Sequence, residues 1–574
     1  MKEYSGFSAK TVLLIASLMV LVSCKDTWNE HYSYKADSNF PVDKIDITLE
    51  GVEGYDKFYA ALETTYLYDR DGKRYKDNQN FLDLLHQDQF ITVWAPSNES
   101  ISDSLWSIYT DPNKSDSINY EVGERFLKNH IARFKHTISS VDTTKVFMMN
   151  GKPVVSTPTT IGDDGHYHGN DKNIRCLNGI LHFLDGNIAY KPNIYEYITT
   201  TSEYREILGK WFKSYTIAEI DQEKSVASGK DENGEKIWID AVLIESSILL
   251  KKYGFINSED STYAMLLPTP DLWKAEYNRI KDYYLYSEAK LDNDSLQKFY
   301  TGSAMLTDMV INMNQKVQRD LPDSVYTTLY DYSGNENRRD KRPYHVFSYP
   351  YDKVNGVFGS ALDSIECSNG KIYVINKWPF VDTLSFLRNI KFEAENYRNL
   401  PSFFTMYQRT INTVAGKKLD NSIRIMRIFQ EKNYWGAGSG ASFSIPGNLK
   451  GKYAVKLVML PNQEENNKPI LFHPVIKYNN ITLFDSMKIV WEYYTNIATG
   501  ELDSTMASEE FVLANSPDKI DTLLLSEVDI PYCSYDMPSS PLTVTLYSRV
   551  NENNTDTYSA ELWLDGIILE PVVE

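Results

Sequence analysis

A pair of histidines is the first feature of the sequence that could do chemistry. His166 and His168 stand two positions apart, so they would point the same way from a strand and could bind a transition metal. A third ligand is not evident beside them in the sequence, and the acidic and amide residues on both sides indicate an exposed hairpin. We therefore interpret the pair as a surface feature.

The common enzymatic motifs are absent from the sequence. It has no Gly-x-Ser-x-Gly elbow, no His-Glu-x-x-His and no phosphate-binding glycine loop. Acidic residues are abundant, so a glycosidase with paired carboxylates stays open as an alternative. Cys176, Cys367 and Cys533 fall in three different candidate domains, which argues against a disulfide framework and favours buried apolar roles.

The N-terminal segment predicts export and a lipid anchor. Lys2 and Lys10 precede an apolar run, residues 11–22, that is too short for a stable membrane span and has signal-peptide length. The run ends in Leu-Val-Ser before Cys24, which resembles the lipobox of bacterial lipoproteins, whose cysteine is diacylated. An ordinary signal peptide with an accidental cysteine is the alternative. We expect a signal peptide over 1–23.

Residues 25–32 follow that cysteine and start with lysine and aspartate. They are similar to the export signal by which Bacteroidetes lipoproteins reach the cell surface. The resemblance implies a tether over 24–42 and an outer-membrane lipoprotein, anchored through lipid on Cys24, that faces the cell exterior.

Composition bears on the partners of the chain. The formal net charge of −19 argues against nucleic acid or anionic lipid, because either would require clustered Lys and Arg. The 41 tyrosines are about twice ordinary usage, which suits either interaction surfaces or β-sheets. A chain of 574 residues is long enough for about three or four domains.

An internal repeat divides the middle of the chain. A Cys-x-Asn-Gly turn followed by strand residues occurs at 176–183 and again at 367–374. Asn-Gly is a strong hairpin signal, because both residues tolerate positive φ. Upstream of each turn, a buried strand breaks at a proline before a helix N-cap, at Pro96 and at Pro268. We predict two homologous domains.

These residues resemble the fasciclin (FAS1) domain. The first copy matches the family's opening motif at 92–101, its central helix-to-strand motif at residues 129–131 (Asn-His-Ile), and its closing strand at 178–182. The second copy keeps the proline and the Asn-Gly turn but has no evident Asn-His-Ile equivalent.

The resemblance implies two α+β domains, each a β-wedge with helices, over 43–190 and, in degenerate form, over 191–386. In the first domain we expect a helical run near 120–133 and alternating strands near 145–155.

From residue 387 to 574 the pattern becomes nearly all β, with turn-separated strands typical of a sandwich. Its opening Glu-Ala-Glu and its terminal strand with an aspartate resemble carbohydrate-binding jelly rolls. In those modules such residues hold a structural calcium, an ion that takes hard oxygen ligands. The resemblance therefore implies Glu393, Glu395 and Asp565 as Ca²⁺ ligands, and a solvated strand face is the alternative for the glutamates.

Exposed aromatic residues would bind sugar on such a sandwich by stacking. The candidates are Tyr434, Trp435 and Trp491, although residues of these types more often belong to a core.

A recurring triplet predicts covalent modification. Asp, then Ser or Thr, then an apolar residue or Thr resembles the O-glycosylation site of exported Bacteroidetes proteins, and it occurs eleven times. About two or three are expected by chance, and helix N-caps and turns explain part of the excess. We predict glycan on the exposed subset. The candidate acceptors are Ser104, Ser117, Thr143, Ser261, Ser295, Ser324, Ser364, Thr383, Ser486, Ser504 and Thr522.

The sequence thus predicts a multidomain, non-enzymatic surface lipoprotein with two α+β FAS1 domains and an all-β jelly-roll-like sandwich. Its likeness to fasciclin lipoproteins found beside SusC/SusD nutrient importers implies a SusCD-type partner and a polysaccharide or peptide ligand. Adhesion to cells or matrix through the FAS1 domains is the rival function, and a glycan hydrolase is a third.

Overall fold

The structure, a computed structural model, describes residues 41–573 apart from short gaps. The gaps are residues 69–72, 76–77, 140, 170, 221–225, 231–233, 235, 241–242, 261, 288–292, 315–322, 327–344, 397–403, 431–439, 486–512, 538, 551 and 560. The chain forms two compact units, Met1–Lys191 and Pro192–Glu574. Cys24 and the predicted signal peptide lie outside the described residues. None of the described helices is long and apolar enough to cross a membrane.

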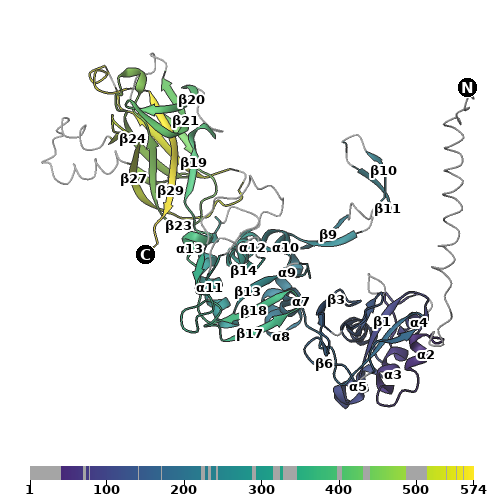
Figure 1. Cartoon of the computed structure of the whole chain (residues 1–574). Coiled ribbons are helices and arrows are strands. Elements are labelled where there is room, and N and C mark those ends of the chain that lie inside the picture. Colours follow the sequence, from purple (N-terminus) through teal and green to yellow (C-terminus); the bar gives the residue numbers. More distant parts are fainter. Residues whose placement is uncertain are drawn as a thin grey trace, which may run out of the picture. The chain divides into compact units, whose positions relative to one another are not determined.

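A four-stranded mixed sheet organises the first unit (Figure 1). Its order is β2-β1-β8-β7, with β1 (Ile91–Pro96) and β8 (Gly179–Leu184) parallel at the centre and buried at every position. β2 (Ile131–Arg133) and β7 (Ile174–Cys176) pair antiparallel at the edges. Because the central strands have no solvated side, other elements must cover them. The helices that contribute to this core are α2 (Ile45–Leu49), α3 (Asp56–Thr64), α4 (Phe81–His86) and α5 (Asp103–Tyr109); α6 (Asp116–Glu121) follows them in the chain.

The helical run expected over 120–133 is shorter in the structure. After α6 the chain continues as a π-helical turn, η2 (Val122–Leu127), and a 3₁₀ turn, η3 (Lys128–His130), and it becomes strand at Ile131. The expectation for the last three residues was wrong, because pairing with β1 overrides their local helical pattern.

The alternating pattern near 145–155 forms two strands of a second, smaller sheet in the first unit. That sheet has the order β3-β4-β5-β6. Its strands are β3 (Thr144–Phe147), β4 (Pro153–Ser156), β5 (Thr160–Ile161) and β6 (Gly165–His166).

Residues 192–386, which we term the second module, repeat the main sheet of the first unit in the order β14-β13-β18-β17. The central pair is again parallel and starts with Tyr263 opposite Gly370, as Ile91 stands opposite Gly179 in the first copy. The two copies therefore share topology and register. The strands of this sheet are β13 (Tyr263–Pro268), β14 (Val310–Asn312), β17 (Asp363–Cys367) and β18 (Gly370–Ile375).

The side chain of the asparagine in the Asn-Gly turn forms hydrogen bonds between the sheet and segments that precede it in the sequence. Asn178 Nδ2 donates to the carbonyl oxygens of Leu85 (2.6 Å) and Gln87 (2.8 Å), and its Oδ1 accepts the N–H of Ile45 (3.0 Å). Asn369 makes the same three bonds in the second module. Its partners are Ile256, Ser258 and Ile194.

The glycine of this turn is required for space. A Cβ on Gly179 would lie 1.9 Å from the carbonyl oxygen of Ile91, and a Cβ on Gly370 would lie 1.9 Å from that of Tyr263. Neither turn asparagine has a positive φ. The turn was predicted correctly, but the reason assigned to its asparagine was wrong, because that residue supplies an amide clamp and not a positive φ. The glycine allows the close strand approach, and Gly370 also has a positive φ of 149°.

The second module adds helices and a two-stranded arm. In the arm, β9 (Thr216–Ile220) pairs with β12 (Leu243–Ser247), and β10 (Val226–Lys230) pairs with β11 (Lys236–Asp240). Figure 1 shows it leading away from the sheet. The helices are α7 (Ile194–Thr200), α8 (Ser202–Tyr204), α9 (Lys210–Ser214), α10 (Ile248–Tyr253), α11 (Pro270–Lys281), α12 (Asn293–Leu306) and α13 (Asp382–Ser385). In addition, β15 (Ser324–Tyr326) pairs antiparallel with β16 (Val346–Ser348).

Residues 387–574, which we term the β-domain, form two antiparallel sheets. One has the order β20-β21-β29-β23-β27 with β19 beside β29, and the other has the order β22-β28-β24-β25 with β26 beside β24. Side chains of both sheets, such as Trp563 and Phe472, belong to one apolar core. The strands are β19 (Ile390–Glu393), β20 (Phe404–Val414), β21 (Lys417–Gln430), β22 (Gly440–Ser444), β23 (Gly451–Met459), β24 (Leu471–Tyr478), β25 (Ile481–Asp485), β26 (Leu513–Ala514), β27 (Asp521–Ile530), β28 (Leu542–Ser548) and β29 (Leu562–Pro571).

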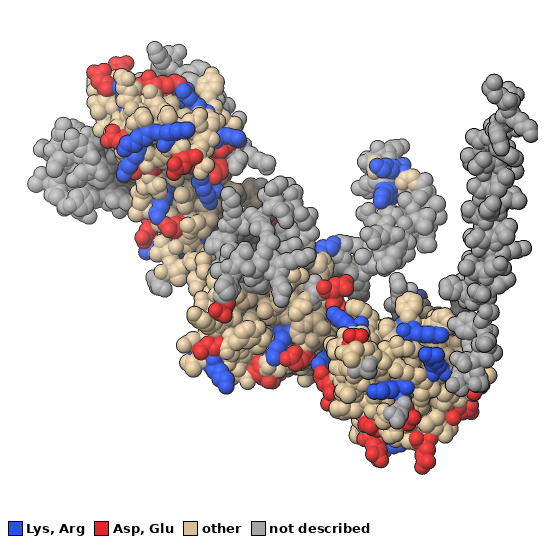
Figure 2. All heavy atoms as spheres, in the orientation of Figure 1, with Lys and Arg blue, Asp and Glu red and all other residues tan. Residues whose placement is uncertain are grey.

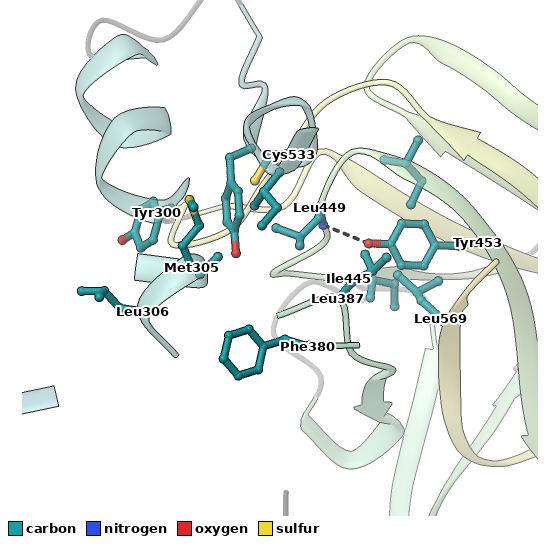
Figure 3. Close-up of a cluster of buried hydrophobic side chains, with 14 of the residues drawn as sticks. Tyr300, Met305, Leu306, Phe380, Leu387, Ile445, Leu449, Tyr453, Cys533 and Leu569 are labelled. Carbon is teal, nitrogen blue, oxygen red and sulfur yellow. Dashed lines mark hydrogen bonds between the residues drawn. The ribbon is translucent and has the colours of Figure 1, made fainter. Parts of the chain in front are cut away.

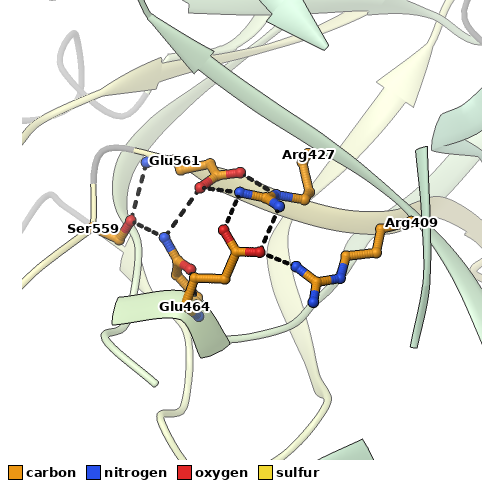
Figure 4. Close-up of polar contacts among 6 residues, drawn as sticks. Arg409, Arg427, Glu464, Ser559 and Glu561 are labelled. Carbon is orange, nitrogen blue, oxygen red and sulfur yellow. Dashed lines mark hydrogen bonds and ion pairs between the residues drawn. The ribbon is translucent and has the colours of Figure 1, made fainter. Parts of the chain in front are cut away.

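A network of ion pairs links two strands, the segment before β29 and a short 3₁₀ turn of the β-domain (Figure 4). Arg427 pairs with both Glu464 and Glu561, and Arg409 also pairs with Glu464. The two guanidinium groups lie over the ring of Trp563, at 5.0 and 5.5 Å from its centroid, in cation–π contact. Hydrogen bonding to Arg427 is the main reason why the pKa of Glu464 lies below its usual range. The cluster balances two cations with two anions and stabilises this part of the sheet.

Charged side chains are intermixed on the molecular surface. On the face shown in Figure 2, lysine and arginine alternate with aspartate and glutamate over both units. No extended basic field appears among the described residues of that face.

Candidate binding pocket

The second module and the β-domain meet in one continuous apolar cluster (Figure 3). Tyr300 from α12 lies in it together with Leu449 and Cys533 from β-domain loops. Two backbone bonds cross the same boundary: the N–H of Cys533 donates to the carbonyl of Leu285 (2.7 Å), and the N–H of Lys450 donates to that of Tyr283 (2.9 Å). We call this boundary the seam. It is a bonded interface inside one compact unit.

A cavity of about 230 Å³ lies at the seam. Its walls come from α10, the 3₁₀ turn η5 (Asp282–Tyr284), α12 and the segment from Ser385 to Ile390. The β-domain adds the loop before β23, β23 itself and the loop after β27. We call it the seam cavity. Its volume falls below the roughly 300 Å³ at which drug-sized sites begin, so it suits a ligand of one ring.

Tyrosines dominate the seam cavity. Tyr284 and Tyr300 stack with their ring centroids 6.1 Å apart, and Tyr535 stands edge-on to both, at 6.4 and 5.0 Å. The hydroxyl of Tyr300 donates to Asp536, whereas that of Tyr453 accepts the N–H of Leu449 (3.3 Å). Tyr535 is the exposed member of the group, with 41% of its surface accessible.

These tyrosines are held in their neutral form. Burial is the main cause that raises the pKa of Tyr284 far above its ordinary value, and burial likewise raises the pKa of Tyr300 and Tyr453. Their hydroxyls therefore keep the proton and can act as donors as well as acceptors at any physiological pH.

Two cations and one unsatisfied hydroxyl complete the walls. Lys252 and Arg388 are the charged residues that line the seam cavity. The Arg388 guanidinium donates to the carbonyl oxygens of Ser385 (2.6 Å) and Leu384 (2.8 Å), which fixes its orientation. Ser303 on α12 is 4% exposed, and its Oγ is buried with no hydrogen-bond partner. A buried polar atom without a partner is uncommon and marks a place where a ligand atom or water is needed.

Ser385, which lines the cavity, belongs to a cluster with Asp308 and His345. Ser385 Oγ donates to Asp308 Oδ2, and His345 Nδ1 is 3.5 Å from the same oxygen. His345 Nε2 accepts the N–H of Val381 (2.7 Å). In a hydrolytic triad the histidine lies between serine and carboxylate and takes the serine proton. The carboxylate occupies the middle position in this cluster, so its geometry is that of a buried clamp.

The first unit has a related clamp built from different residues. His130 Nε2 accepts the N–H of Ile188 (3.0 Å), just after β8, and Asn129 Nδ2 donates to the Ile188 carbonyl (2.8 Å). The strand registers align Asn129-His130 with Asp308-Met309, because Ile131 and Val310 occupy equivalent pairing positions. The second module thus replaces this histidine with His345, which comes from a different segment of the chain.

The proposed calcium ligands are brought together only in part. Glu393 on β19 pairs with Gly566 on β29, which places it beside Asp565. Lys391 Nζ lies between them, 2.9 Å from Glu393 Oε1 and 3.5 Å from Asp565 Oδ2. Burial is the main cause that raises the pKa of Asp565, and Lys391 opposes it.

The third proposed ligand, Glu395, has a buried Oε2 without a partner. Within the described part of the chain, no group of three His, Cys, Asp or Glu side chains is close enough to hold a metal ion. The donor set in this arrangement fits the Lys391 ammonium better than Ca²⁺, and the calcium site stays a prediction.

The other predicted residues divide between surface and undescribed segments. Tyr434, Trp435 and Trp491 lie outside the described residues, as do the candidate acceptors Ser261, Ser486 and Ser504. His166 and His168 are exposed on either side of the buried Tyr167, and His168 pairs with Asp185, whose hydrogen bond raises the pKa of the histidine. The exposed acceptors are Ser104, Ser117, Thr143, Ser295, Ser364 and Thr522, and the half-buried ones are Ser324 and Thr383.

Helix starts account for several of the Asp-Ser and Asp-Thr triplets. Asp103, Asp116, Asp294 and Asp382 all stand in the first turn of a helix, where a carboxylate is favourable. These triplets have a structural reason that does not need a glycan.

Sequence reasoning did not find the residues of the seam cavity. They are separated by long stretches of chain, from Lys252 to Tyr535, and converge only because two modules associate. The high tyrosine content of the chain indicated interaction surfaces, but it did not identify which tyrosines form them.

The chain has a distant similarity to a solved structure. No protein-family model matches it, and no curated protein matches it. Among solved structures it is similar to a FAS1 domain pair from the insect cell adhesion molecule fasciclin I, at 11% identity, over 52% of this chain and 90% of that one, with a TM-score of 0.17.

Proposed function

We propose that this chain is a non-enzymatic lipoprotein of the outer cell surface, which serves as a binding or accessory subunit of a SusCD-type glycan or peptide importer. The observation that carries the binding role is the seam cavity, which has tyrosine walls and a buried hydroxyl without a partner. Pockets with aromatic walls and a few placed polar groups are the usual form of small-ligand sites.

The arrangement of polar groups at the cavity favours binding over hydrolysis. Ser385 is the serine of the wall that contacts a carboxylate and lies near a histidine, and it already donates its proton to Asp308. A hydrolytic triad places a histidine between the serine and the carboxylate, whereas Ser385 donates directly to the carboxylate of Asp308.

A glycan array read with the full chain tests the binding role. Tyr535→Ala should weaken capture, because it removes the half-exposed ring at the seam cavity. Tyr407→Ala is the matched control, since this tyrosine is 55% exposed on β20 and does not line the cavity. If both variants bind like the parent protein, the cavity is not the binding site.

Extraction in mild detergent through a C-terminal tag tests the importer assignment. Co-purification of a large β-barrel supports it, and repeated absence of one favours the rival function of adhesion.

Cys24→Ala should leave the fold intact and move the protein from the membrane fraction to the soluble fraction, because lipid on that residue is the proposed anchor. If the variant still sediments with membranes, a partner holds it there.

We also propose that the β-domain is a jelly-roll-like carbohydrate-binding sandwich. Its two antiparallel sheets with a shared core and the proximity of Glu393 to Asp565 support this. Calcium added to metal-free protein should raise the melting temperature of the second unit if the calcium assignment holds, and Asp565→Asn should abolish that rise. No rise in the parent protein removes the assignment.

Glycan at the exposed Ser and Thr acceptors is a further proposal. The intact mass of protein from its native host should exceed that of the lipidated polypeptide. A mass equal to the lipidated polypeptide contradicts it.

A further inference from the structure

One edge of the main sheet in the first unit exposes large apolar side chains. β1 and β8 are parallel and both start at this edge, and β2 ends there because it pairs antiparallel with β1. The exposed side chains beside these strand ends, which we call the apolar edge, are Val42 (83% exposed), Phe90 (53%), Phe134 (73%) and Leu177 (46%). The N–H of Phe134 donates to the carbonyl of Phe90 (2.7 Å), and the N–H of Leu177 donates to that of Asp43 (2.8 Å). Neighbouring apolar groups that face water mark an interaction site.

The backbone of Phe134 is unusual as well. Its φ of 68° lies in the left-handed region, which a bulky side chain rarely adopts. Residues with such torsions persist where the surrounding structure fixes them, and they cluster at functional sites. Here the strained residue carries a largely exposed aromatic ring, which a role at the surface would explain.

Two cations border the apolar edge. Lys135 Nζ lies 4.0 Å from the centroid of the Phe90 ring, and Arg133 is exposed at the end of β2. Neither forms an ion pair with a described residue, whereas Asp88 near the same edge is paired with Lys44 (2.8 Å). Aromatic and aliphatic side chains flanked by Lys and Arg are typical of a surface at a lipid interface, where apolar groups enter the acyl boundary and cations meet headgroup phosphates.

The predicted tether joins the first unit at this edge. Val42, the last residue of the tether, is followed by Asp43, which accepts from Leu177, and by Lys44, which donates to the carbonyl of His86 (2.7 Å). Even when fully extended, residues 24–42 span at most about 65 Å. Lipid on the predicted anchor would therefore hold this edge nearer to the bilayer than other parts of the unit.

Taking these points together, we infer that the apolar edge lies on a phospholipid surface, with its two phenylalanines at the acyl boundary and Arg133 and Lys135 on headgroup phosphates. The inference rests on the proposed lipid anchor and adds which face of the first unit meets the membrane. The net charge of −19 argues against attraction to an anionic surface, so apolar contact provides the binding and a zwitterionic lipid suffices. A few side chains bind a bilayer less firmly than acyl chains do, so this contact orients the anchored protein and does not replace its anchor.

Fluorescence quenching of the lipidated full chain in phosphatidylcholine vesicles tests this contact. Phe134→Cys introduces a thiol at the apolar edge, and Ile108→Cys introduces one on α5 as the matched control. Ile108 is 44% exposed, and α5 packs near the opposite end of β1, where Trp106 Nε1 donates to the carbonyl of Asn98 (2.9 Å). The cysteines among the described residues are buried, so a thiol-reactive dye labels the introduced residue.

The two labels should respond in opposite ways. The dye at residue 134 should lose fluorescence to nitroxide-bearing lipid and be shielded from aqueous iodide, because lipid covers it, and the dye at residue 108 should do the reverse. Phe90→Asp, added to Phe134→Cys, should return the dye to iodide, because a carboxylate is costly at the acyl boundary. Leu105→Asp on α5, where the leucine is 43% exposed, is the control and should leave the signal unchanged.

The outcomes separate this inference from the proposed function. A chain that floats with the vesicles but leaves the dye at residue 134 open to iodide overturns the inference and keeps the anchor. Shielding of that dye in native outer membranes but not in vesicles also overturns it, because a protein partner then covers the edge instead of lipid. A chain that does not float loses both the anchor and this inference, whereas repeated absence of a β-barrel removes the importer alone.

Discussion

The amide clamp of Asn178 makes a stability prediction that is specific to one unit. Asn178→Ala removes three hydrogen bonds to groups near the start of the first unit and leaves the carbonyls of Leu85 and Gln87 and the N–H of Ile45 without that partner. The asparagine is 2% exposed, so water does not easily replace it. At about 1 kcal/mol per bond the loss is about 3 kcal/mol, a large part of the roughly 5–15 kcal/mol that stabilises a domain.

Urea unfolding followed by hydrogen exchange of individual peptides measures this loss. The midpoint for β1 and β8 should fall by about 1–3 M, since denaturant slopes for small domains are about 1–3 kcal/mol per M. Peptides from β13 and β18 should keep their midpoint, because all three bonds lie inside the first unit. Asn369→Ala should lower the midpoint for β13 and β18 and leave that for β1 and β8 unchanged.

A neighbouring residue of the same turn serves as the control. Leu177→Ala removes a side chain that is 46% exposed and should shift neither unit by more than about 0.5 kcal/mol. The stabilising role of the amide clamp is contradicted if Asn178→Ala changes the free energy of unfolding no more than Leu177→Ala does. It is also contradicted if Asn178→Ala destabilises both units equally.

Two further predictions concern pH and the ion-pair network. Burial lowers the pKa of His130 and His182 to about 4. Below about pH 6.5 the unfolded chain therefore binds protons that the folded first unit does not. The free energy of unfolding of the first unit should fall as the pH is lowered from about 6.5 to 4, by about 3 kcal/mol for each histidine. Urea midpoints at pH 7 and pH 4.5 measure this, and a flat profile contradicts it. Arg427→Ala should cost the second unit about 2 kcal/mol, because Glu561, with 12% of its side chain exposed, loses its cation. Arg424→Ala, an exposed change on the same strand, should cost almost nothing in the same denaturation assay.

The repeat was predictable because its marker residues have no substitutes. Proline ends the central strand in each copy, and a glycine is required where the parallel neighbour leaves no room for a Cβ, at Gly179 and Gly370. Such constraints leave the same letters in both copies. The reason assigned to the asparagine was wrong, since a dipeptide pattern does not say whether the side chain is used for its torsions or for its hydrogen bonds.

The seam cavity was not predictable, for a different physical reason. Its walls depend on the association of two modules, and no local pattern encodes which loop meets which helix. Tyr284 on a 3₁₀ turn and Tyr535 after a β-domain strand become neighbours through that contact alone. Periodicity identifies the buried side of an element, but the partner of that side is a property of the whole chain.

The histidine clamp explains why the Asn-His-Ile motif of the first copy has no counterpart at the same position of the second copy. Each copy has a backbone N–H just after its last central strand, at Ile188 and at Val381, and that N–H is accepted by a histidine nitrogen. In the first unit the histidine directly precedes β2, whereas in the second module Met309 occupies that position and His345 comes from a distant segment. A backbone N–H needs an acceptor, but that acceptor can come from different segments of the chain. The same hydrogen bond is present in both copies, but the histidine that accepts it lies at different positions in the sequence. A motif defined by fixed spacing therefore does not detect it.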